Sequence, residues 1–332
     1  MGVYKTAYLS IGSNLGNREI LLQKAIFEIG NKAGEIRQVS AIYETPSWGF
    51  EAEDFLNACI EVQTLLSPED LLYELLRIET DFGRERTNST SYQSRTLDID
   101  IIYYENKIIE SNTLTIPHPK MQERKFILKP LADITPQFYH PILNKDTRNL
   151  LQGCKDKSII IKLPKKLFKN RHSLFASFEY MAIEGNIGAG KTTLATKISD
   201  DFNAKLILER FAENPFLPSF YEDQSRYAFP LEMSFLADRY QQFREDTNQL
   251  DLFKSFMVSD YDIYKSLIFA KVTLQQNEFE LYRKVFNFMY KEVKKPKIYV
   301  YLYQTTERLL QQIKKRGRDY EQNIELSYLE RI

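Results

Sequence analysis

Residues 95–102 read Arg-Thr-Leu-Asp-Ile-Asp-Ile-Ile. The apolar side chains alternate with Asp98 and Asp100, as in a strand that turns both carboxylates to one face. Two carboxylates about 7 Å apart along a strand suit Mg²⁺ ions that carry a polyphosphate. The same alternation also fits an ordinary half-exposed strand, so the flanking sequence has to separate the two interpretations.

The elements expected before this stretch alternate in type. Apolar runs predict strands over residues 4–11, 35–43 and 55–66. One helix is expected between the first two strands, ending near Gly30, and another runs from Ser67, its N-cap, to Gly83. With residues 95–102 as the last strand, the order is βαββαβ, which matches the ferredoxin-like α+β arrangement.

Basic side chains flank the predicted acidic strand. Arg84 and Arg86 follow the second helix and Arg95 leads into the strand, so the three are expected to converge on its acidic end. Guanidinium groups bind phosphate oxygens and offset the charge that builds up in phosphoryl transfer. Each arginine alone is more often a solvated surface residue, and His118, between two prolines, is alone more often structural. The combination favours phosphoryl transfer.

Six short motifs follow one another in the first 164 residues: GSNLG at 12–16, YETP at 43–46, FLNA at 55–58, GRER at 83–86, RTLDID at 95–100 and PH at 117–118. Together they closely resemble 6-hydroxymethyl-7,8-dihydropterin pyrophosphokinase (HPPK, a 2-amino-4-hydroxy-6-hydroxymethyldihydropteridine diphosphokinase) of folate biosynthesis. The resemblance implies transfer of pyrophosphate from ATP to the hydroxymethyl oxygen of the pterin, with release of AMP.

The same resemblance implies roles for individual residues. Asp98 and Asp100 would hold two Mg²⁺ ions that bridge ATP and the attacking hydroxyl. The residues implied in contacts with ATP are Glu79, Arg84, Arg86, Arg95, Thr115, His118 and Arg124. The residues implied around the pterin are Thr45, Pro46, Phe55, Asn57 and Phe126, with the aromatic rings stacking on it and Asn57 reading it through its amide.

Length and composition describe a cytoplasmic protein of about two domains. Lys plus Arg and Asp plus Glu number 45 each in 332 residues, so no net charge attracts nucleic acid or an anionic membrane. No apolar run reaches the ~18 residues of a membrane span, and two cysteines favour a reducing compartment over a disulfide framework. The expected domains are residues 1–164 and 178–332, joined by a basic linker at 165–177.

The second half of the chain opens on a nucleotide-binding motif. GNIGAGKT, residues 185–192, follows an apolar run at 178–184 that predicts a strand, and precedes a helical pattern, the context that a P-loop requires. The N–H groups around Gly185, Gly188 and Gly190 would wrap a triphosphate. Lys191 would reach the terminal phosphates and Thr192 would hold Mg²⁺. Further strands are expected at 205–209, 255–259 and 298–303, which gives a parallel α/β sheet of the P-loop NTPase type.

Three stretches around this motif resemble deoxynucleoside kinases: ERFAENPFLPSFY at 209–221, YAF at 227–229 and RGR at 316–318. The resemblance implies that Glu209 is the base that takes the proton of the sugar 5′-hydroxyl. Glu232 stands where a base-reading amide often lies, and Arg316 and Arg318 would close on the phosphates as lid residues. Without the P-loop, a solvated helix face would be the better interpretation of the two arginines.

Two features depart from that family. The residues Asp260-Tyr261-Asp262 replace a stretch in which the family carries an arginine near the reacting hydroxyl. The chain also stops at Ile332 within an apolar pattern, before the family's last strand, which indicates either a truncated protein or a degraded kinase. Three hypotheses follow: an HPPK with an appended kinase-like domain, a bifunctional enzyme with an active deoxynucleoside kinase, or a C-terminal half that only binds nucleotide or dimerises.

Overall fold

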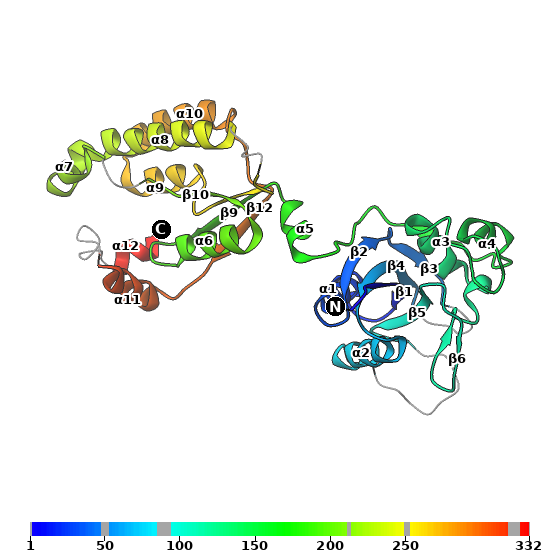
Figure 1. Cartoon of the computed structure of the whole chain (residues 1–332). Coiled ribbons are helices and arrows are strands. Elements are labelled where there is room, and N and C mark those ends of the chain that lie inside the picture. The colour runs from blue at the N-terminus through cyan, green and yellow to red at the C-terminus, as the bar shows by residue number, and fades with distance from the viewer. Residues whose placement is uncertain are drawn as a thin grey trace. The chain divides into compact units, whose positions relative to one another are not determined.

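The computed structural model describes residues 2–47, 53–84, 94–210, 214–248, 253–317 and 326–331. The chain divides into two compact units, Met1–Leu174 and Phe175–Ile332 (Figure 1). Short α5 (Arg171–Ala176) lies at the division. None of the helices in the described part of the chain has the length and apolar character that crossing a bilayer requires.

An antiparallel sheet forms the centre of the N-terminal unit. Its strands are β1 (Lys5–Ser13), β2 (Glu35–Val39), β3 (Tyr43–Thr45), β4 (Phe55–Thr64), β5 (Asp98–Tyr104) and β8 (Ile161–Lys162). The order across the sheet is β5-β1-β4-β3-β8, and β2 also pairs with β4. The strand predicted over residues 95–102 is β5, and it begins at Asp98, three residues later than predicted.

The strand predicted over residues 35–43 is two strands, β2 and β3. Val39 pairs with Ile60 and Tyr43 with Asn57, so four steps along one side of the ladder face three steps along β4. Ser40 still lies opposite Cys59, because its N–H donates to the Cys59 carbonyl and its hydroxyl accepts the Cys59 N–H, both at 2.9 Å, so the extra residue lies between Ser40 and Tyr43. An alternation of apolar residues does not reveal such an interruption, because the flanking residues keep their strand character.

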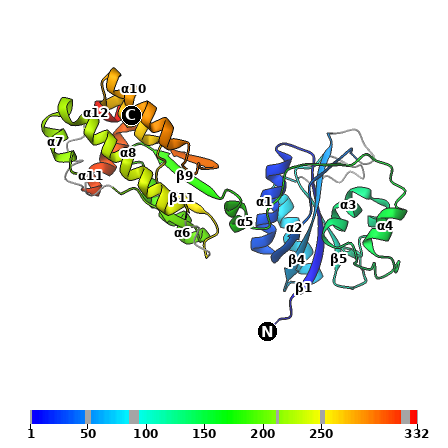
Figure 2. The same ribbon diagram turned by 90° about the horizontal axis from the view of Figure 1, so that it is seen from above.

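Helices cover both faces of this sheet (Figure 2). On one face lie α1 (Arg18–Lys32) and α2 (Pro68–Asp81), and on the other α3 (Lys125–Ile134) and α4 (Thr147–Gly153). Short β6 (Ile109–Glu110), β7 (Thr115–Ile116) and η1 (Met121–Glu123) connect β5 to α3. Leu9 and Ile11 face α1 and α2, whereas Tyr8 and Cys59 face α3, so successive side chains of a strand enter two separate cores.

The C-terminal unit is built on a parallel sheet, which confirms the predicted strand direction. Its strands are β9 (Tyr180–Gly185), β10 (Lys205–Ile207), β11 (Met257–Ser259) and β12 (Ile298–Leu302), in the order β10-β11-β9-β12. The strand that carries the P-loop thus lies between two neighbours, and its carboxyl end opens at the same edge as theirs.

Two groups of helices enclose this sheet (Figure 1). α6 (Lys191–Phe202) packs on one face, and α8 (Gln224–Asn248), α9 (Lys265–Thr273) and α10 (Gln276–Tyr290) pack on the other. α7 (Leu217–Glu222) precedes α8, and α11 (Thr306–Arg316) and α12 (Leu326–Arg331) complete the unit. Leu309, Ile313 and Leu329 form a small cluster with Ala189, so the last two helices pack against the P-loop.

Candidate active sites

Gly12 links two groups of functional side chains in the N-terminal unit. It pairs with Asp98 of β5 on one side and with Asn57 of β4 on the other. Because paired residues of antiparallel strands point to the same face, Asp98 and Asn57 share a face and lie about 10 Å apart, two strand spacings. A Cβ on Gly12 would come within 3.0 Å of Asn57 Oδ1, so glycine keeps the space beside that amide.

Asp98 is held between two arginines. Arg84 Nη1 lies 2.6 Å from Asp98 Oδ1, and Arg95 Nη1 lies 2.6 Å from Asp98 Oδ2. Behind them, Glu79 pairs with Arg84 and accepts the Ile99 N–H at 2.8 Å. The Glu79 side chain is 1% exposed, so it fixes Arg84 and the start of β5 from the interior and does not itself reach the surface.

Asp100 lies deeper than Asp98 on the same strand. Burial and, to a smaller extent, the negative charge of Asp98 raise the pKa of the Asp100 carboxyl to about 7, although the charge of Arg124 opposes both. Burial likewise lowers the pKa of His118 to about 4, with a smaller contribution from Arg124. The imidazole is therefore neutral at physiological pH, and its Nδ1 accepts the Lys120 N–H at 3.3 Å.

The residues implied around the pterin lie along β3, β4 and α3. Asn57 Nδ2 donates to Thr45 Oγ1 at 2.8 Å, and both side chains are buried. Phe55 opens β4 opposite Thr45 in the ladder. The guanidinium of Arg124 lies 5.7 Å from the centre of the Phe126 ring, which joins an expected ATP contact to an expected pterin contact. Pro46 and Thr115 are exposed, and Arg86 lies outside the described residues.

Asn14 is a supporting residue that the reasoning from sequence used only as part of a motif. The Asn14 side chain is fully buried, and its Oδ1 accepts the backbone N–H of Arg95 at 2.6 Å. The backbone N–H of Asn14 donates to the Arg95 carbonyl at 3.1 Å. Asn14 Nδ2 also donates to Ser94 Oγ at 3.1 Å. These bonds fix the backbone that delivers Arg95 to Asp98. A polar residue directly after a buried strand was the available signal.

The P-loop of the C-terminal unit has the backbone that its glycines allow. Gly185, Gly188 and Gly190 have φ values of 146°, 82° and 94°, conformations that side chains disfavour. Lys191 Nζ donates to the carbonyls of Gly185 and Asn186 at 2.8 and 3.0 Å. The pKa of Lys191 is lowered to about 8, first by burial and then by the charge of Lys265.

Asp260 ties the P-loop to the expected catalytic base, and the interpretation of the sequence gave it no role. Its Oδ2 accepts the Thr192 hydroxyl at 2.5 Å, and its Oδ1 accepts the Glu209 N–H at 2.9 Å. Asp260 directly follows β11, at the carboxyl edge of the sheet. An acidic residue at the end of an apolar strand beside a P-loop strand was the signal that could have found it.

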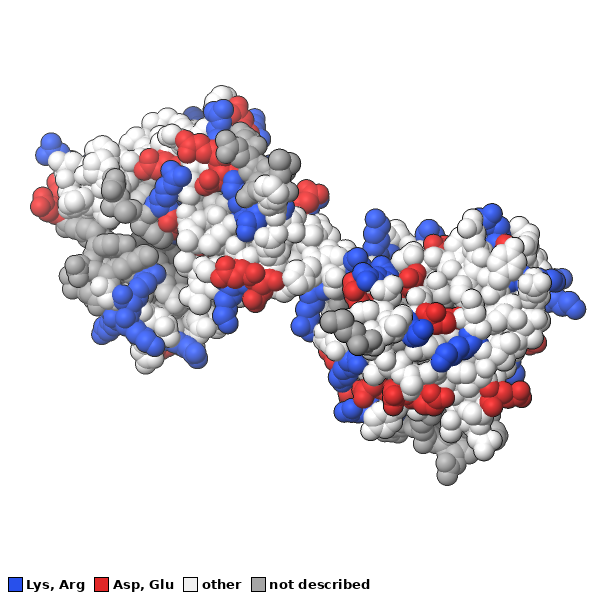
Figure 3. Space-filling view, viewed as in Figure 1, with Lys and Arg blue, Asp and Glu red and all other residues white. Residues whose placement is uncertain are grey.

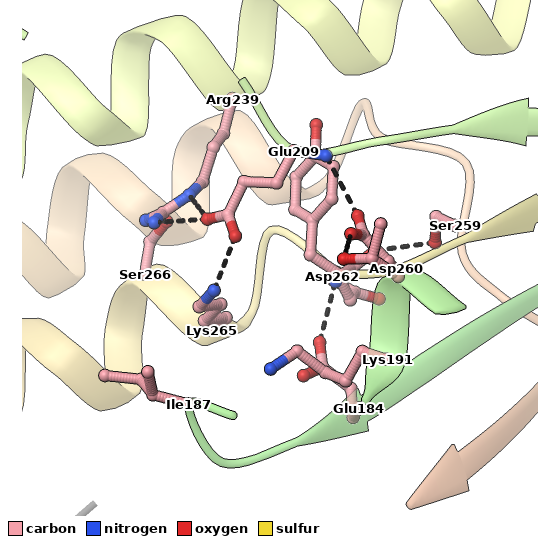
Figure 4. Close-up of polar contacts among 12 residues, drawn as sticks. Glu184, Ile187, Lys191, Glu209, Arg239, Ser259, Asp260, Asp262, Lys265 and Ser266 are labelled. Atoms are coloured by element: carbon pink, nitrogen blue, oxygen red, sulfur yellow. Dashed lines mark hydrogen bonds and ion pairs between the residues drawn. The ribbon is translucent and has the colours of Figure 1, made fainter. Parts of the chain in front are cut away.

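Glu209 is buried, and each of its carboxylate oxygens contacts a cationic side chain (Figure 4). Arg239 Nε and Nη2 donate to Oε1 at 3.0 and 2.7 Å, and Lys265 Nζ lies 2.6 Å from Oε2. Burial alone would raise the pKa of the Glu209 carboxyl, but Lys265 and Arg239 outweigh it and lower this pKa to about 2.

Glu232 lies on the same helix as Arg239, seven residues before it. Two turns of helix place the two side chains on one face, about 10 Å apart along the axis. Glu232 Oε1 accepts the Thr273 hydroxyl at 3.1 Å, whereas Oε2 is buried and has no hydrogen-bond partner among the described residues. Burial raises the pKa of the Glu232 carboxyl to about 7.

Of the two arginines expected as lid residues, the structure describes only Arg316. Arg316 ends α11, whose last turn is basic, and Figure 3 shows basic side chains gathered over this helix. Gly317 follows in the left-handed conformation, with φ of 70°. Arg318 lies outside the described residues.

The comparisons with known proteins assign each unit to a family. Residues 8–136 match the model of 7,8-dihydro-6-hydroxymethylpterin-pyrophosphokinase (HPPK), and residues 181–332 match that of deoxynucleoside kinase. The two units are thus kinase domains of two different families, which imply ATP as co-substrate. The chain belongs to the HPPK family through its N-terminal unit and to the deoxynucleoside kinase family through its C-terminal unit.

Three relatives show how far each similarity extends. The chain is 44% identical over 154 residues to deoxyguanosine kinase of Bacillus subtilis, covering 46% of this chain and 74% of that protein. It is 37% identical over 141 residues to 2-amino-4-hydroxy-6-hydroxymethyldihydropteridine pyrophosphokinase of Aquifex aeolicus, covering 42% and 86%. It is 38% identical over 179 residues to folic acid synthesis protein fol1 of Pneumocystis carinii, covering 54% of this chain but only 24% of that protein.

Proposed function

We propose that the N-terminal unit transfers pyrophosphate from ATP to 6-hydroxymethyl-7,8-dihydropterin and releases AMP. Asp98, Gly12 and Asn57 form a row of paired residues across β5, β1 and β4. This row carries the proposal, because it sets an acidic group and an amide about 10 Å apart on one face of the sheet. Family membership supplies the substrates. The strand order and the helices α1 and α2 also support the ferredoxin-like assignment of this unit.

The side chains at one end of the row suit the phosphates. Asp98 and Asp100 are the residues that would hold Mg²⁺, which proteins commonly bind through one or two carboxylates together with substrate phosphates. The raised pKa of Asp100 fits this role, because a cation would relieve the two neighbouring negative charges. When bound, Mg²⁺ would neutralise charge on the phosphates. Arg84 and Arg95, held in place by Glu79 and Asn14, would then face the phosphate oxygens.

The side chains at the other end suit a flat heterocycle. The buried Asn57 amide offers a donor and an acceptor side by side, with one of its donors held by Thr45. Phe55 and Phe126 supply aromatic faces. The hydroxymethyl group of a ring bound there would point along the row toward Asp98.

Asp98→Asn tests this assignment. The substitution removes a charge that holds both arginines and the expected cation, so pterin-dependent AMP formation should fall on the order of 10²–10³-fold. AMP is measured by chromatography with ATP, Mg²⁺ and the pterin, and thermal unfolding checks the fold. Asp81→Asn is the matched control, because Asp81 is an exposed partner of Lys32 at the end of α2. A normal rate in Asp98→Asn would rule out the assigned metal site.

The C-terminal unit is proposed to phosphorylate a deoxynucleoside, with deoxyguanosine as the preferred substrate. The 5′-hydroxyl would lose its proton to Glu209 as its oxygen bonds to the γ-phosphorus of ATP, and the bond to the β-phosphate oxygen breaks to leave ADP. Lys191 and the P-loop N–H groups would hold the phosphates. Thr192 and Asp260 would hold Mg²⁺.

Glu232 carries the proposed base preference. Its position about 10 Å from Arg239 along α8 matches the length of a nucleoside whose sugar lies at Glu209. An ionised carboxylate only accepts hydrogen bonds. Guanine presents two adjacent N–H donors on its Watson–Crick edge, whereas adenine presents one donor beside an acceptor. The unpartnered Oε2 therefore favours guanine.

Glu232→Gln should change the base preference. An amide matches the donor and acceptor of adenine, so the ratio of kcat/KM for deoxyguanosine over deoxyadenosine should fall about 10–100-fold. In the unmodified protein this ratio should rise between pH 6 and 8, as Glu232 loses its proton near pH 7. Glu245→Gln, at an exposed position of α8, is the control.

The same assay separates the alternatives for the C-terminal unit. ADP formed with a deoxynucleoside identifies a bifunctional enzyme. Binding of ATP through Lys191 without turnover of any deoxynucleoside would identify a nucleotide-binding module and refute the second activity. An unchanged base ratio in Glu232→Gln would refute only the assignment of Glu232.

A further inference from the structure

Lys265 occupies an unfavourable position for a cation. It is the first residue of α9, where the helix dipole is positive, and its Tyr264 cap supplies no side-chain hydrogen bond. Its side chain is only 10% exposed, so little water compensates the charge. The charge is instead balanced by Glu209, whose Oε2 lies 2.6 Å from Lys265 Nζ. A buried lysine at the positive end of a helix dipole is unfavourable by itself, which indicates that its ion pair with Glu209 has a function.

The next residue of α9 secures the second cation. Ser266 Oγ accepts from Arg239 Nη1 at 2.7 Å, while the other two nitrogens of the Arg239 guanidinium, Nε and Nη2, donate to Glu209 Oε1. The Arg239 guanidinium also lies 5.1 Å from the centre of the Phe235 ring. Arg239 is thus fixed on one carboxylate oxygen, and the first turn of α9 governs the orientation of the whole carboxylate.

Lys265 also lies on the phosphate side of Glu209. Figure 4 shows its ammonium group between the Glu209 carboxylate and Lys191, and its charge acts on Lys191. The stretch Asp260-Tyr261-Asp262, which precedes α9, contributes no cation. In this chain Arg239 of α8 and Lys265 of α9 supply the positive charge beside Glu209 instead.

We propose that Lys265 is a positioning residue for phosphoryl transfer in the C-terminal unit. Its ammonium group holds Glu209 Oε2 toward the phosphate side, so that this oxygen meets the substrate hydroxyl in the direction of proton transfer. Lys265 acts through Glu209 and takes no part in the proton transfer itself. This inference rests on the proposed deoxynucleoside kinase activity.

The test is a double-mutant cycle on the full-length chain. Initial rates with ATP, Mg²⁺ and deoxyguanosine are measured for the unmodified protein, Lys265→Met, Glu209→Gln and the double variant. Lys265→Met should lower kcat about 100-fold, because a misplaced base loses most of its contribution, with the KM for ATP changed less than about 3-fold. In the Glu209→Gln background the same change should cost less than about 2-fold, because no base remains to be positioned.

Two further variants separate positioning from general loss of structure. Lys265→Arg keeps the charge and should recover kcat to within about 10-fold of the unmodified protein. Lys271→Met, at an exposed position near the end of α9, should leave kcat unchanged.

Equal losses from Lys265→Met in both backgrounds would overturn the inference, as would no recovery in Lys265→Arg. A loss expressed mainly in the KM for ATP would also overturn it, because Lys265 would then bind nucleotide directly. An unmodified protein that binds ATP but phosphorylates no deoxynucleoside would refute the proposed function as well, and is recognised before any variant is made.

Discussion

Asp100, Glu209 and Glu232 are carboxylates with shifted pKa values, and their neighbours decide the direction of each shift. Burial raises the pKa of Asp100 and of Glu232 to about 7, whereas Lys265 and Arg239 lower that of the buried Glu209 to about 2. Two direct cation contacts thus outweigh the loss of solvation. The raised pKa values of Asp100 and Glu232 fit the proposed partners of these carboxylates, a cation at Asp100 and a nucleobase at Glu232.

Asp100→Asn should stabilise the N-terminal unit at high pH. The pKa of Asp100 is higher in the folded protein than in the unfolded chain, so the folded state loses stability as pH rises from about 4 through 7. An amide removes this cost, and the rise of the pKa from 3.8 to about 7 corresponds to a gain of about 4 kcal/mol at pH 8 and a smaller gain at pH 5. Thermal unfolding without ATP or metal measures it, with Asp81→Asn as control. Equal gains at both pH values would contradict the pKa assignment.

Among the elements, the P-loop and α11 depend on each other. Gly188 and Gly190 both have positive φ, but a Cβ on Gly188 would come within 3.0 Å of the Leu309 carbonyl and of Ile313 Cγ1. A Cβ on Gly190 would meet nothing within 4 Å. The backbone of α11 therefore limits the P-loop at one glycine and leaves the other free of steric contact.

This difference predicts unequal effects of two alanines. Gly188→Ala and Gly190→Ala should each cost about 1–2 kcal/mol of backbone strain, and Gly188→Ala should cost more because it also displaces α11. Thermal unfolding of the C-terminal unit should therefore show a larger loss of Tm for Gly188→Ala. Equal losses of Tm would mean that backbone strain alone accounts for both variants and that α11 moves aside without loss of stability.

In the complete chain, each unit has its own core and its own set of proposed catalytic residues. Lys191→Met should therefore abolish deoxynucleoside-dependent ADP formation and leave pterin-dependent AMP formation within about twofold of normal. Asp98→Asn should do the reverse. Both products can be followed in one reaction mixture. Loss of AMP formation in Lys191→Met would show that the two reactions are coupled.

The sequence alone was enough to predict two units, the βαββαβ order of the N-terminal unit apart from the division of residues 35–43, the parallel sheet of the C-terminal unit and the two families. These features depend on local patterns: apolar periodicity, the glycines of the P-loop, and motifs in which the functional residues are near neighbours. Asp98 and Asp100 on one strand, and Lys191 and Thr192 at the start of a helix, are fixed by such short-range geometry.

The distant side chains that complete each site are visible only once the chain is folded. Asn14 reaches Arg95 across 81 residues, Asp260 reaches Thr192 across 68, and Lys265 reaches Glu209 across 56. The sequence likewise did not predict the burial of Glu79 or the division of residues 35–43 into β2 and β3. Such contacts arise because packing brings the ends of separate elements to one edge of a sheet, and no local pattern of residues encodes which ends will meet.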